Sequence, residues 1–417
     1  MRNKYSLTLF MLVFSLLTLS CGSETGSEVP SVANTEQATT IQLPKLLDRH
    51  PNLRQGKEWD EVQSLFVQFR NNIQQGKKTN EARLQMAQLF VNEARVTGEH
   101  GHYYPAALEV LDAGLGDHKL DKDLRFRLLS TKASILLSLH QFKKGLEVGE
   151  EALALNSHNS GIYGILIDAN VELGNYEKAV ELADQMVAIR PDLRSYARIS
   201  YLREIHGDWQ GAIEAMQMAV KAGFPGMEQT SWTRLTLGKL YAEYGDTDQA
   251  AKQFEIVLAN RPDYPFAIAE LARLDMEKGN YQQAEASLKK AAAIMPEFSF
   301  FQDLAEIYLR TGRSEEFDET VKYLLTMLNE DEAAGHRMDL EKSIVYAKLL
   351  KDYDRALATA HLAYQERPNN IDVNRTIAKI LIEAGQSEKA KPYVLAAAIT
   401  NSQKPEFLQL QQSLAMK

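Results

Sequence analysis

The chain has 417 residues, of which 45% are hydrophobic and 25% are charged, and its formal net charge is −9 at pH 7. This composition is ordinary for a soluble globular protein, and the length would usually mean two or three compact domains. Non-specific nucleic-acid binding requires a basic surface, so we expect no nucleic-acid partner for this acidic chain.

Residues 1–20 predict a signal peptide, because a basic start leads into an apolar run that is too short for a comfortable membrane span. Cys21, the only cysteine, follows directly. This arrangement resembles the lipobox of bacterial lipoproteins, although Thr18 stands where leucine is usual. The resemblance implies cleavage before Cys21, lipid attachment to its thiol and anchorage to a membrane of the bacterial cell envelope. The alternative is an ordinary secretory signal with an incidental cysteine.

Residues 21–42 are expected to form the lipidated cysteine and a flexible tether, because Ser, Thr, Gly, Glu and Val follow one another there without a helical or strand period. Removal of the signal peptide leaves 45 basic against 56 acidic residues, a net charge of −11. Residues 43–79 are predicted to hold an N-terminal capping helix. Its apolar side chains recur three or four positions apart, at Trp59, Val62, Phe66, Phe69 and Ile73.

From residue 80 to residue 417 a motif of the form Gly-x-x-x-x-Ala recurs. Its last position falls at Ala106, Gly145, Ala179, Ala212, Ala250, Ala284, Phe317, Ala356 and Ala390. The intervals are 39, 34, 33, 38, 34, 33, 39 and 34 residues. A fixed period in this range is the signature of a stacked repeat architecture, here with about nine units.

Within each period the pattern predicts two amphipathic helices. In the unit that starts at Ser160, apolar residues recur at helical spacing until Gly174, which suits a left-handed C-cap. Asn175 then suits the N-cap of the second helix, and Pro191 ends the unit. The two longest intervals that follow are attributed to insertions at residues 221–231 and near 329–338.

These features resemble the tetratricopeptide repeat (TPR). Its first helix has a small residue seven positions before the turn glycine, and Gly238, Ala272, Ala305 and Ala378 fit that position. Its second helix opens with a small residue, which the recurring alanines supply. The resemblance is strongest over residues 159–297. It implies an all-α, right-handed solenoid of stacked antiparallel helix pairs, whose first helices line a concave groove.

The sequence contains no P-loop, no dinucleotide-binding glycine motif and no His-Glu-x-x-His. Glu99, His100 and His102 come nearest to a metal site, but they fall in a polar turn without a further ligand in sight. We therefore expect no enzymatic activity, no cofactor and no metal.

Binding is expected on the inner face, where residues one repeat apart form columns. The candidates are Arg194, Trp232 and Phe266 in one column and Tyr201, Lys239 and Arg273 in another. Such an aromatic pair beside a basic pair suits a protein or peptide with an apolar anchor and a carboxylate. Two adjacent cations repel each other, so Lys239 and Arg273 are expected to be dispensable for folding. Alternatively, the rings pack between repeats and the cations pair with Glu204 or Glu306.

The sequence thus favours a membrane-anchored scaffold lipoprotein that binds a protein or peptide in the bacterial cell envelope. The alternative is a lipoprotein that captures a glycan or nutrient on the same repeat frame. That role would need long insertions with aromatic platforms, and the two insertions are short.

Overall fold

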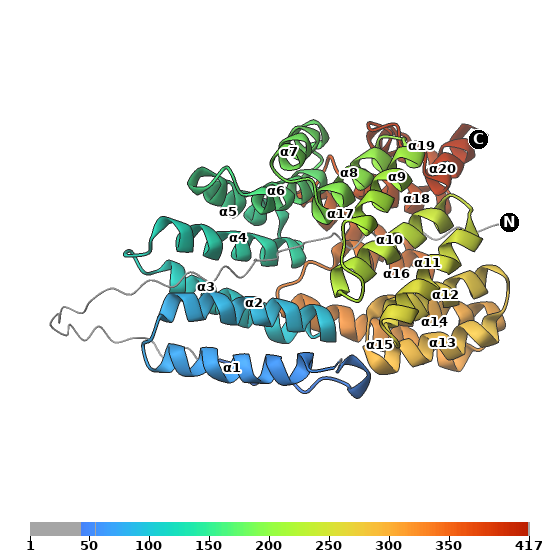
Figure 1. The fold of residues 1–417 in the computed structure, drawn as a ribbon. Helices are drawn as coiled ribbons and strands as arrows, with labels where there is room; N and C mark the ends of the chain where they lie inside the picture. Colours follow the sequence, from blue (N-terminus) through green and yellow to red (C-terminus); the bar gives the residue numbers. More distant parts are fainter. Residues whose placement is uncertain (1–42, 55, 416–417) are drawn as a thin grey trace, which may run out of the picture.

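The computed structural model describes residues 43–54 and 56–415, and every regular element within these ranges is a helix (Figure 1). The elements of the first half are η1 (Pro51–Leu53), α1 (Glu58–Gln74), α2 (Thr79–Thr97), α3 (His100–Leu115), α4 (Lys122–Ser138), α5 (Phe142–Leu155), α6 (Ser160–Leu173), α7 (Tyr176–Ile189), α8 (Leu193–Ile205), α9 (Trp209–Lys221) and α10 (Glu228–Glu243). Those of the second half are α11 (Thr247–Asn260), α12 (Pro265–Glu277), α13 (Tyr281–Ile294), α14 (Phe298–Thr311), α15 (Ser314–Ala333), α16 (Asp339–Lys348), α17 (Tyr353–Glu366), α18 (Ile371–Glu383), α19 (Ser387–Ala397) and α20 (Pro405–Ala415). The predicted signal peptide, Cys21 and the whole of the predicted tether lie outside the described residues.

The helices pack as consecutive pairs, from α2 with α3 to α18 with α19. Nine such pairs follow one another in the described ranges, with α1 before them and α20 after them. The first helix of one pair also contacts the first helix of the next, as α6 contacts α8 and α12 contacts α14, so the first helices line the inner side of the stack. The prediction of an all-α right-handed solenoid is confirmed.

Small residues sit where the two helices of a pair approach each other. The alanines that open the second helices are fully buried, namely Ala179, Ala212, Ala250, Ala284, Ala356 and Ala390. At Gly238 on the inner helix α10, a Cβ atom would lie 2.3 Å from the Phe254 ring of α11. The ring fills the space that a side chain would need, which explains the glycine.

The turn between the helices of a pair is set by its backbone. Gly174 ends α6 with a φ of 80°, in the left-handed conformation that the sequence predicts. Asn175 occupies the N-cap position of α7, but its side chain makes no cap hydrogen bond. Its side-chain amide instead donates to Asn170 Oδ1 over 3.1 Å, so the predicted N-cap position is confirmed although the side chain does not cap the helix.

The solenoid coils back on itself, so the later repeats rest on the earlier ones. Arg367 forms an ion pair with Glu172, 195 residues away in the chain. The Asn370 amide donates to the Glu172 carbonyl over 2.9 Å, and the Ile371 N–H donates to the Tyr176 hydroxyl over 2.8 Å. Successive superhelical turns therefore touch.

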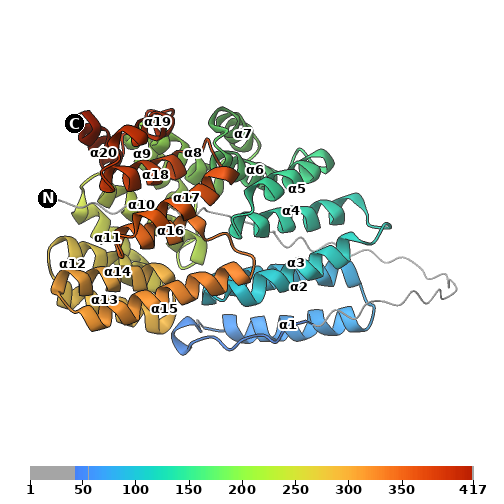
Figure 2. The same cartoon turned by 180° about the vertical axis from the view of Figure 1, so that it is seen from behind.

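We use the term seam for the contacts of residues 335–337, 367–371 and 404 with the earlier repeats. The Arg337 N–H donates to the Leu139 carbonyl over 3.1 Å, and Lys404 lies 3.2 Å from Glu204. Helix α15 also contacts α3, as both views of the fold show (Figures 1 and 2). The seam joins parts of the chain that the repeat pattern alone leaves apart.

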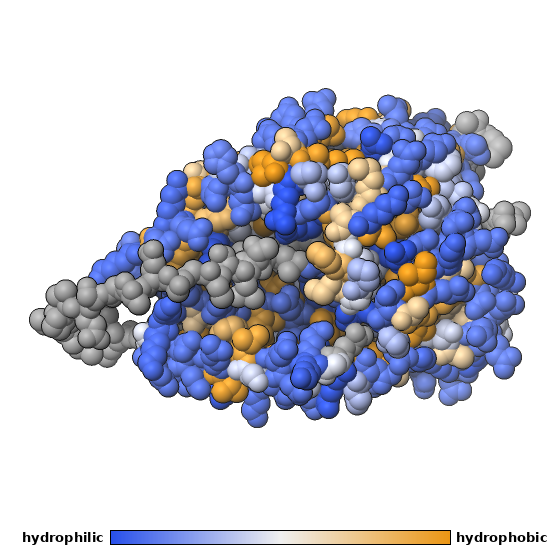
Figure 3. Space-filling view, in the orientation of Figure 1, coloured by the Kyte–Doolittle hydropathy of each residue, from blue (hydrophilic) through white to orange (hydrophobic). Residues whose placement is uncertain are grey.

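The face of the molecule in Figure 3 is mainly hydrophilic, with apolar residues scattered among the polar ones. None of the helices in the described ranges has the length and apolar character needed to cross a membrane.

Candidate partner-binding site

The residues predicted to bind a partner lie on three successive inner helices. Helix α8 carries Arg194 and Tyr201, α10 carries Trp232 and Lys239, and α12 carries Phe266 and Arg273. The Trp232 and Phe266 rings meet edge to face, with 5.2 Å between their centroids. The Lys239 ammonium lies 5.6 Å from the centre of the Trp232 ring. Trp232 and Phe266, which the sequence places one repeat apart in the same column, are therefore neighbours in space.

Both cations of the basic pair already have carboxylate partners. Glu270 lies between them, 3.0 Å from Lys239 Nζ and 2.5 Å from Arg273 Nη1. Arg273 Nε donates to Asp303 over 2.7 Å. Burial by itself would raise the pKa of Glu270, but the charges of Arg273 and Lys239 lower it overall. The inner face at this level is an ion-pair network that runs across three repeats.

This network changes the expected role of the two cations. Lys239 and Arg273 neutralise buried carboxylates, which argues against the expectation that they are dispensable for folding. Glu204 and Glu306, the counter-charges suggested by the sequence, are instead held by Lys404 at 3.2 Å and by Lys348 at 2.6 Å. A partner that bound Arg273 would have to break an existing pair. The binding role of the six candidates stays a prediction.

The two candidates on α8 are held by their own repeat. Arg194 Nη2 lies 3.4 Å from Asp192, the N-cap residue of the same helix. Tyr201 packs on the apolar core of the repeats formed by α4 to α8. Burial raises the pKa of Tyr201 well above its usual value. Both side chains thus contribute to the repeat itself.

A pocket of about 300 Å³ is found farther along the inner face. It is lined by residues of α14, α16, α18 and α20, and by Lys351. Ile344, Ile380 and Leu410 are among its apolar lining residues. Its basic lining residues are Lys348, Lys351, Arg375 and Lys379, and its acidic ones are Glu306, Glu383 and Glu406. Its volume lies at the lower end of the range for small-molecule sites, but charged residues make up a larger share of its lining than is usual for such sites.

Sequence reasoning missed this pocket, although one signal was present. Lys379 lies 34 residues after Val345, so it continues the column that contains Lys239 and Arg273. Arg375 precedes Lys379 by four residues and shares its helix face. The wall formed by α20 could not be foreseen, because α20 follows the last repeat and has no motif.

The histidines considered for metal binding have other partners. His102 Nε2 lies 2.8 Å from the Lys45 carbonyl, and the His100 ring stacks on Tyr104 with 5.2 Å between centroids. Burial lowers the pKa of His100 to about 4, helped by the charges of Arg95 and His140. Over the described residues no group of three or more potential ligands is placed to hold a metal ion.

Comparisons with known proteins agree with this architecture. A family model described as tetratricopeptide repeat matches residues 241–299 and 349–414. Over 173 residues the chain is 29% identical to cellulose synthase operon protein C of Xanthomonas axonopodis pv. citri (strain 306), a match that covers 39% of this chain and 11% of that protein. The chain therefore spans only a small part of the length of that relative.

Solved structures with the same kind of fold show low sequence identity. The Cut9–Hcn1 hetero-tetramer of the APC/C aligns over 86% of this chain and 66% of that chain, with 17% identity and a TM-score of 0.50. A thermophilic TPR protein of Thermus thermophilus aligns over 49% of this chain and 98% of its own, with 20% identity and a TM-score of 0.39. Because the tetratricopeptide repeat model matches two segments and the described helices stack as pairs, this chain is a tetratricopeptide repeat protein.

Proposed function

We propose that this protein is a membrane-anchored scaffold of the bacterial cell envelope, which binds a protein or peptide partner on the inner face of its solenoid. The observation that carries the proposal is the pocket on the last repeats, where three inner helices and α20 surround a space of about 300 Å³. The sequence contains none of the catalytic motifs sought above, which is consistent with repeats that bind a partner. The proposed role is non-catalytic.

The anchoring part of the proposal rests on the N-terminal sequence. A lone cysteine directly after an apolar signal segment is the arrangement that lipoprotein processing requires. Two or more acyl chains on Cys21 would give stable attachment, whereas one chain gives only marginal binding. The polar segment at residues 22–42 would then hold the repeats away from the membrane surface.

The anchoring is tested by expressing the full chain and its Cys21→Ala variant in a bacterial host. We expect the wild-type protein in the membrane fraction and the variant, equally folded, in the soluble fraction of the envelope. Equal membrane retention of both proteins would rule out the lipid anchor.

The scaffold role is tested by crosslinking the tagged wild-type protein in its native membrane and identifying what copurifies. We expect one or a few envelope proteins whose crosslinks map to α14, α16, α18 or α20. Reproducible crosslinks that map only to the outer helices would contradict binding on the inner face.

A second candidate is capture of a glycan. It is favoured by the name of the curated relative, which refers to a cellulose synthase operon. Binding of the purified protein to an array of saccharides, with no envelope protein crosslinked, would support this candidate over the scaffold.

A further inference from the structure

Three histidines from separate parts of the chain meet in the seam. His100 is the first residue of α3, His140 lies in the turn between α4 and α5, and His336 lies in the turn between α15 and α16. The centre of the His336 ring lies 4.5 Å from that of His140 and 6.2 Å from that of His100. We call these three residues the histidine cluster. Because they are far apart in the sequence, the cluster exists only while the seam is closed.

Hydrogen bonds hold the turn that carries His336 against the earlier repeats. The Arg337 N–H donates to the Leu139 carbonyl over 3.1 Å, and the Arg337 carbonyl lies 2.9 Å from His140 Nδ1. Both polar groups of this one residue are therefore engaged across the seam. The neighbouring His336 is held in the interior, where it is only 2% exposed.

The surroundings of the His336 ring do not suit a positive charge. Both ring nitrogens are buried without a hydrogen-bond partner. A neutral ring leaves one N–H donor unmatched, whereas a protonated ring would leave two and would place its charge beside two other histidines. Burial lowers the pKa of His336 well below its usual value of 6.5, and the charges of His140 and His100 lower it further. Burial likewise lowers the pKa of His100 to about 4.

Acidic groups lie around the histidine cluster on three elements. Glu99 is the N-cap residue of α3, Asp331 lies near the end of α15, and Glu341 on α16 has an oxygen 4.0 Å from His140 Nδ1. None of them accepts a hydrogen bond from His336. Burial raises the pKa of Asp331 to about 6, and the charges of neighbouring glutamates raise it further.

The basic groups near the histidine cluster do not favour its protonation. Arg337 pairs with Asp339 at 3.1 Å, and Lys342 pairs with Glu332 at 2.6 Å. The charge of Arg95, on α2, contributes to the lowered pKa of the cluster's first histidine. Added protons would therefore meet further positive charge.

We propose that the histidine cluster makes this part of the seam sensitive to acid: protonation of His336 and His100 releases the turn at residues 335–337 from the earlier repeats. The inference goes beyond the proposed function, because it concerns how the shape of the scaffold is controlled and not what the scaffold binds.

The direction of the effect follows from the protons that each group binds. The two histidines have lowered pKa values while the seam is closed, so each takes up a proton on release once the pH is below about 6.5. Asp331, whose pKa is raised from 3.8 to about 6, gives up a proton on release and opposes them. The net uptake is about one proton, so the ratio of released to closed molecules should rise about tenfold between pH 6 and pH 5.

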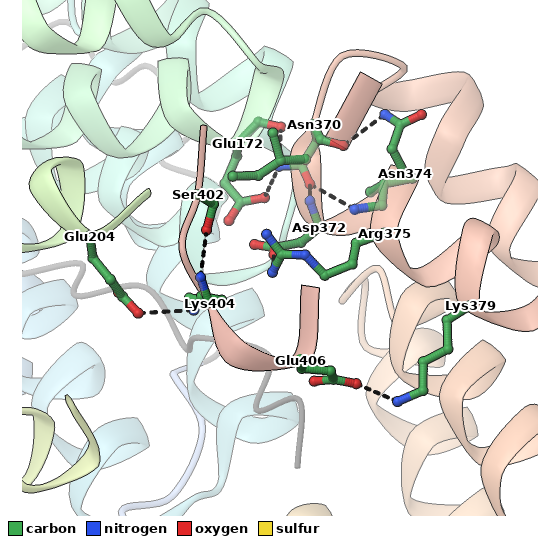
Figure 4. Close-up of polar contacts among 12 residues, drawn as sticks. Glu172, Glu204, Asn370, Asp372, Asn374, Arg375, Lys379, Ser402, Lys404 and Glu406 are labelled. Carbon is green, nitrogen blue, oxygen red and sulfur yellow. Dashed lines mark hydrogen bonds and ion pairs between the residues drawn. The ribbon is translucent and has the colours of Figure 1, made fainter. Parts of the chain in front are cut away.

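A second group of contacts in the seam should not respond in this way. Around Lys404, ion pairs and amide hydrogen bonds join the last repeats to α6 and α8 (Figure 4). Burial raises the pKa of Glu172, so acid does not favour release at this carboxylate. The Ile371 N–H, which donates to the Tyr176 hydroxyl, reports on these contacts. We therefore expect release to be local to residues 335–337.

The test measures hydrogen exchange of the purified protein at pH 6 and at pH 5, with each amide compared with an unstructured peptide at the same pH. We expect the protection of the Arg337 amide to fall about tenfold, while that of the Ile371 amide stays nearly unchanged. His336→Phe and His100→Phe each keep an aromatic ring and remove one proton from the balance. In either variant the fall at Arg337 should disappear.

Two further variants complete the test. Asp331→Asn removes the group that opposes release, so the fall at Arg337 should exceed that of the wild type. His158→Phe is the matched control, because His158 is exposed and lies in the turn between α5 and α6. It should respond as the wild type does. Melting temperatures at pH 7.5 identify any variant that fails to fold.

The proposal would be overturned if the protection of the Arg337 amide did not fall in the wild type, or if it fell to the same extent in both His336→Phe and His100→Phe. An equal fall at the Ile371 amide would also overturn it, because acid would then unfold the repeats as a whole. None of these readouts depends on Cys21 or on a partner.

Discussion

At the scale of the residue, Gly174 shows how one position serves both a turn and the seam. Its φ of 80° disfavours any side chain, and a Cβ atom would lie 2.5 Å from the backbone of Asn369. Gly279 has a nearly equal φ of 81°, but no atom lies within 4 Å of its Cβ position. Gly279→Ala should therefore cost about 1 kcal/mol from backbone strain alone. Gly174→Ala should cost clearly more, because it also forces the seam apart. Urea unfolding of both variants measures the difference, and equal losses would show that the seam contact contributes nothing.

Arg273 is the second residue whose role the structure defines. Arg273→Met leaves Glu270 and Asp303 buried with less counter-charge, and breaking such a pair typically costs about 3–5 kcal/mol. Burial already raises the pKa of Asp303 despite Arg273, and loss of the arginine should raise it further. A carboxylate whose pKa is higher in the folded than in the unfolded state binds a proton on folding, so acid stabilises the fold.

The difference in the free energy of unfolding between the wild type and Arg273→Met should consequently become smaller as the pH falls from about 7.5 to about 5.5. Urea unfolding at the two pH values measures this gap. A gap that widens toward acid would contradict the assignment of Arg273 as the counter-charge of the buried carboxylates.

At the scale of the element, α20 closes the end of the solenoid. Phe407 is only 1% exposed and packs on the core of the last two repeats. Phe407→Ala should cost about 3–5 kcal/mol, as expected for a buried phenylalanine. In a repeat protein each unit contacts only its neighbours, so the loss of stability should affect the adjacent repeats first. Hydrogen exchange should therefore accelerate in α16 to α19. Phe224→Ala is the matched control, because Phe224 is 78% exposed and should change stability by less than about 0.5 kcal/mol. Uniform acceleration along the whole chain would contradict this local picture.

The elements were also the part that the sequence predicted best. The glycine and alanine of each motif impose a turn and a close helix contact locally, so they determine helix pairs without knowledge of the rest of the chain. The insertion expected near residues 329–338 shows the limit of this reasoning. Residues 329–333 of this segment continue α15, which extends over 20 residues to Ala333. A sequence interval gives the number of added residues but not whether they continue a helix.

At the scale of the whole molecule, the seam could not be predicted. Its residues are about 195 positions apart, and their meeting depends on small rotations that accumulate over several repeats. For the same reason, Lys239 and Arg273 were correctly expected to be neighbours, but their partners Glu270 and Asp303 were missed. A column compares the residues at one equivalent position of successive repeats. It therefore identified the basic pair but left out the acidic residues at other positions of the same helices.

The seam also makes a prediction about shape. Arg367 joins Glu172 across the seam and stacks on Phe142, with 4.8 Å from its guanidinium to the ring centre. Burial raises the pKa of Glu172, and the charge of Arg367 opposes this rise. Arg367→Met should leave a buried carboxylate without its counter-charge and so weaken the contact between successive turns.

We therefore expect Arg367→Met to increase the radius of gyration in small-angle X-ray scattering and to speed hydrogen exchange at the Ile371 amide, which bonds to Tyr176 across the seam. Arg355→Met is a close control. Arg355 also pairs with a carboxylate, Asp352, and stacks on a ring at 4.9 Å, but both contacts lie within one repeat. It should change neither measurement. If Arg367→Met and Arg355→Met gave the same radius and the same exchange rate, the superhelix would be held closed by helix packing alone. The ion pair across the seam would then have no part in setting the shape of the molecule.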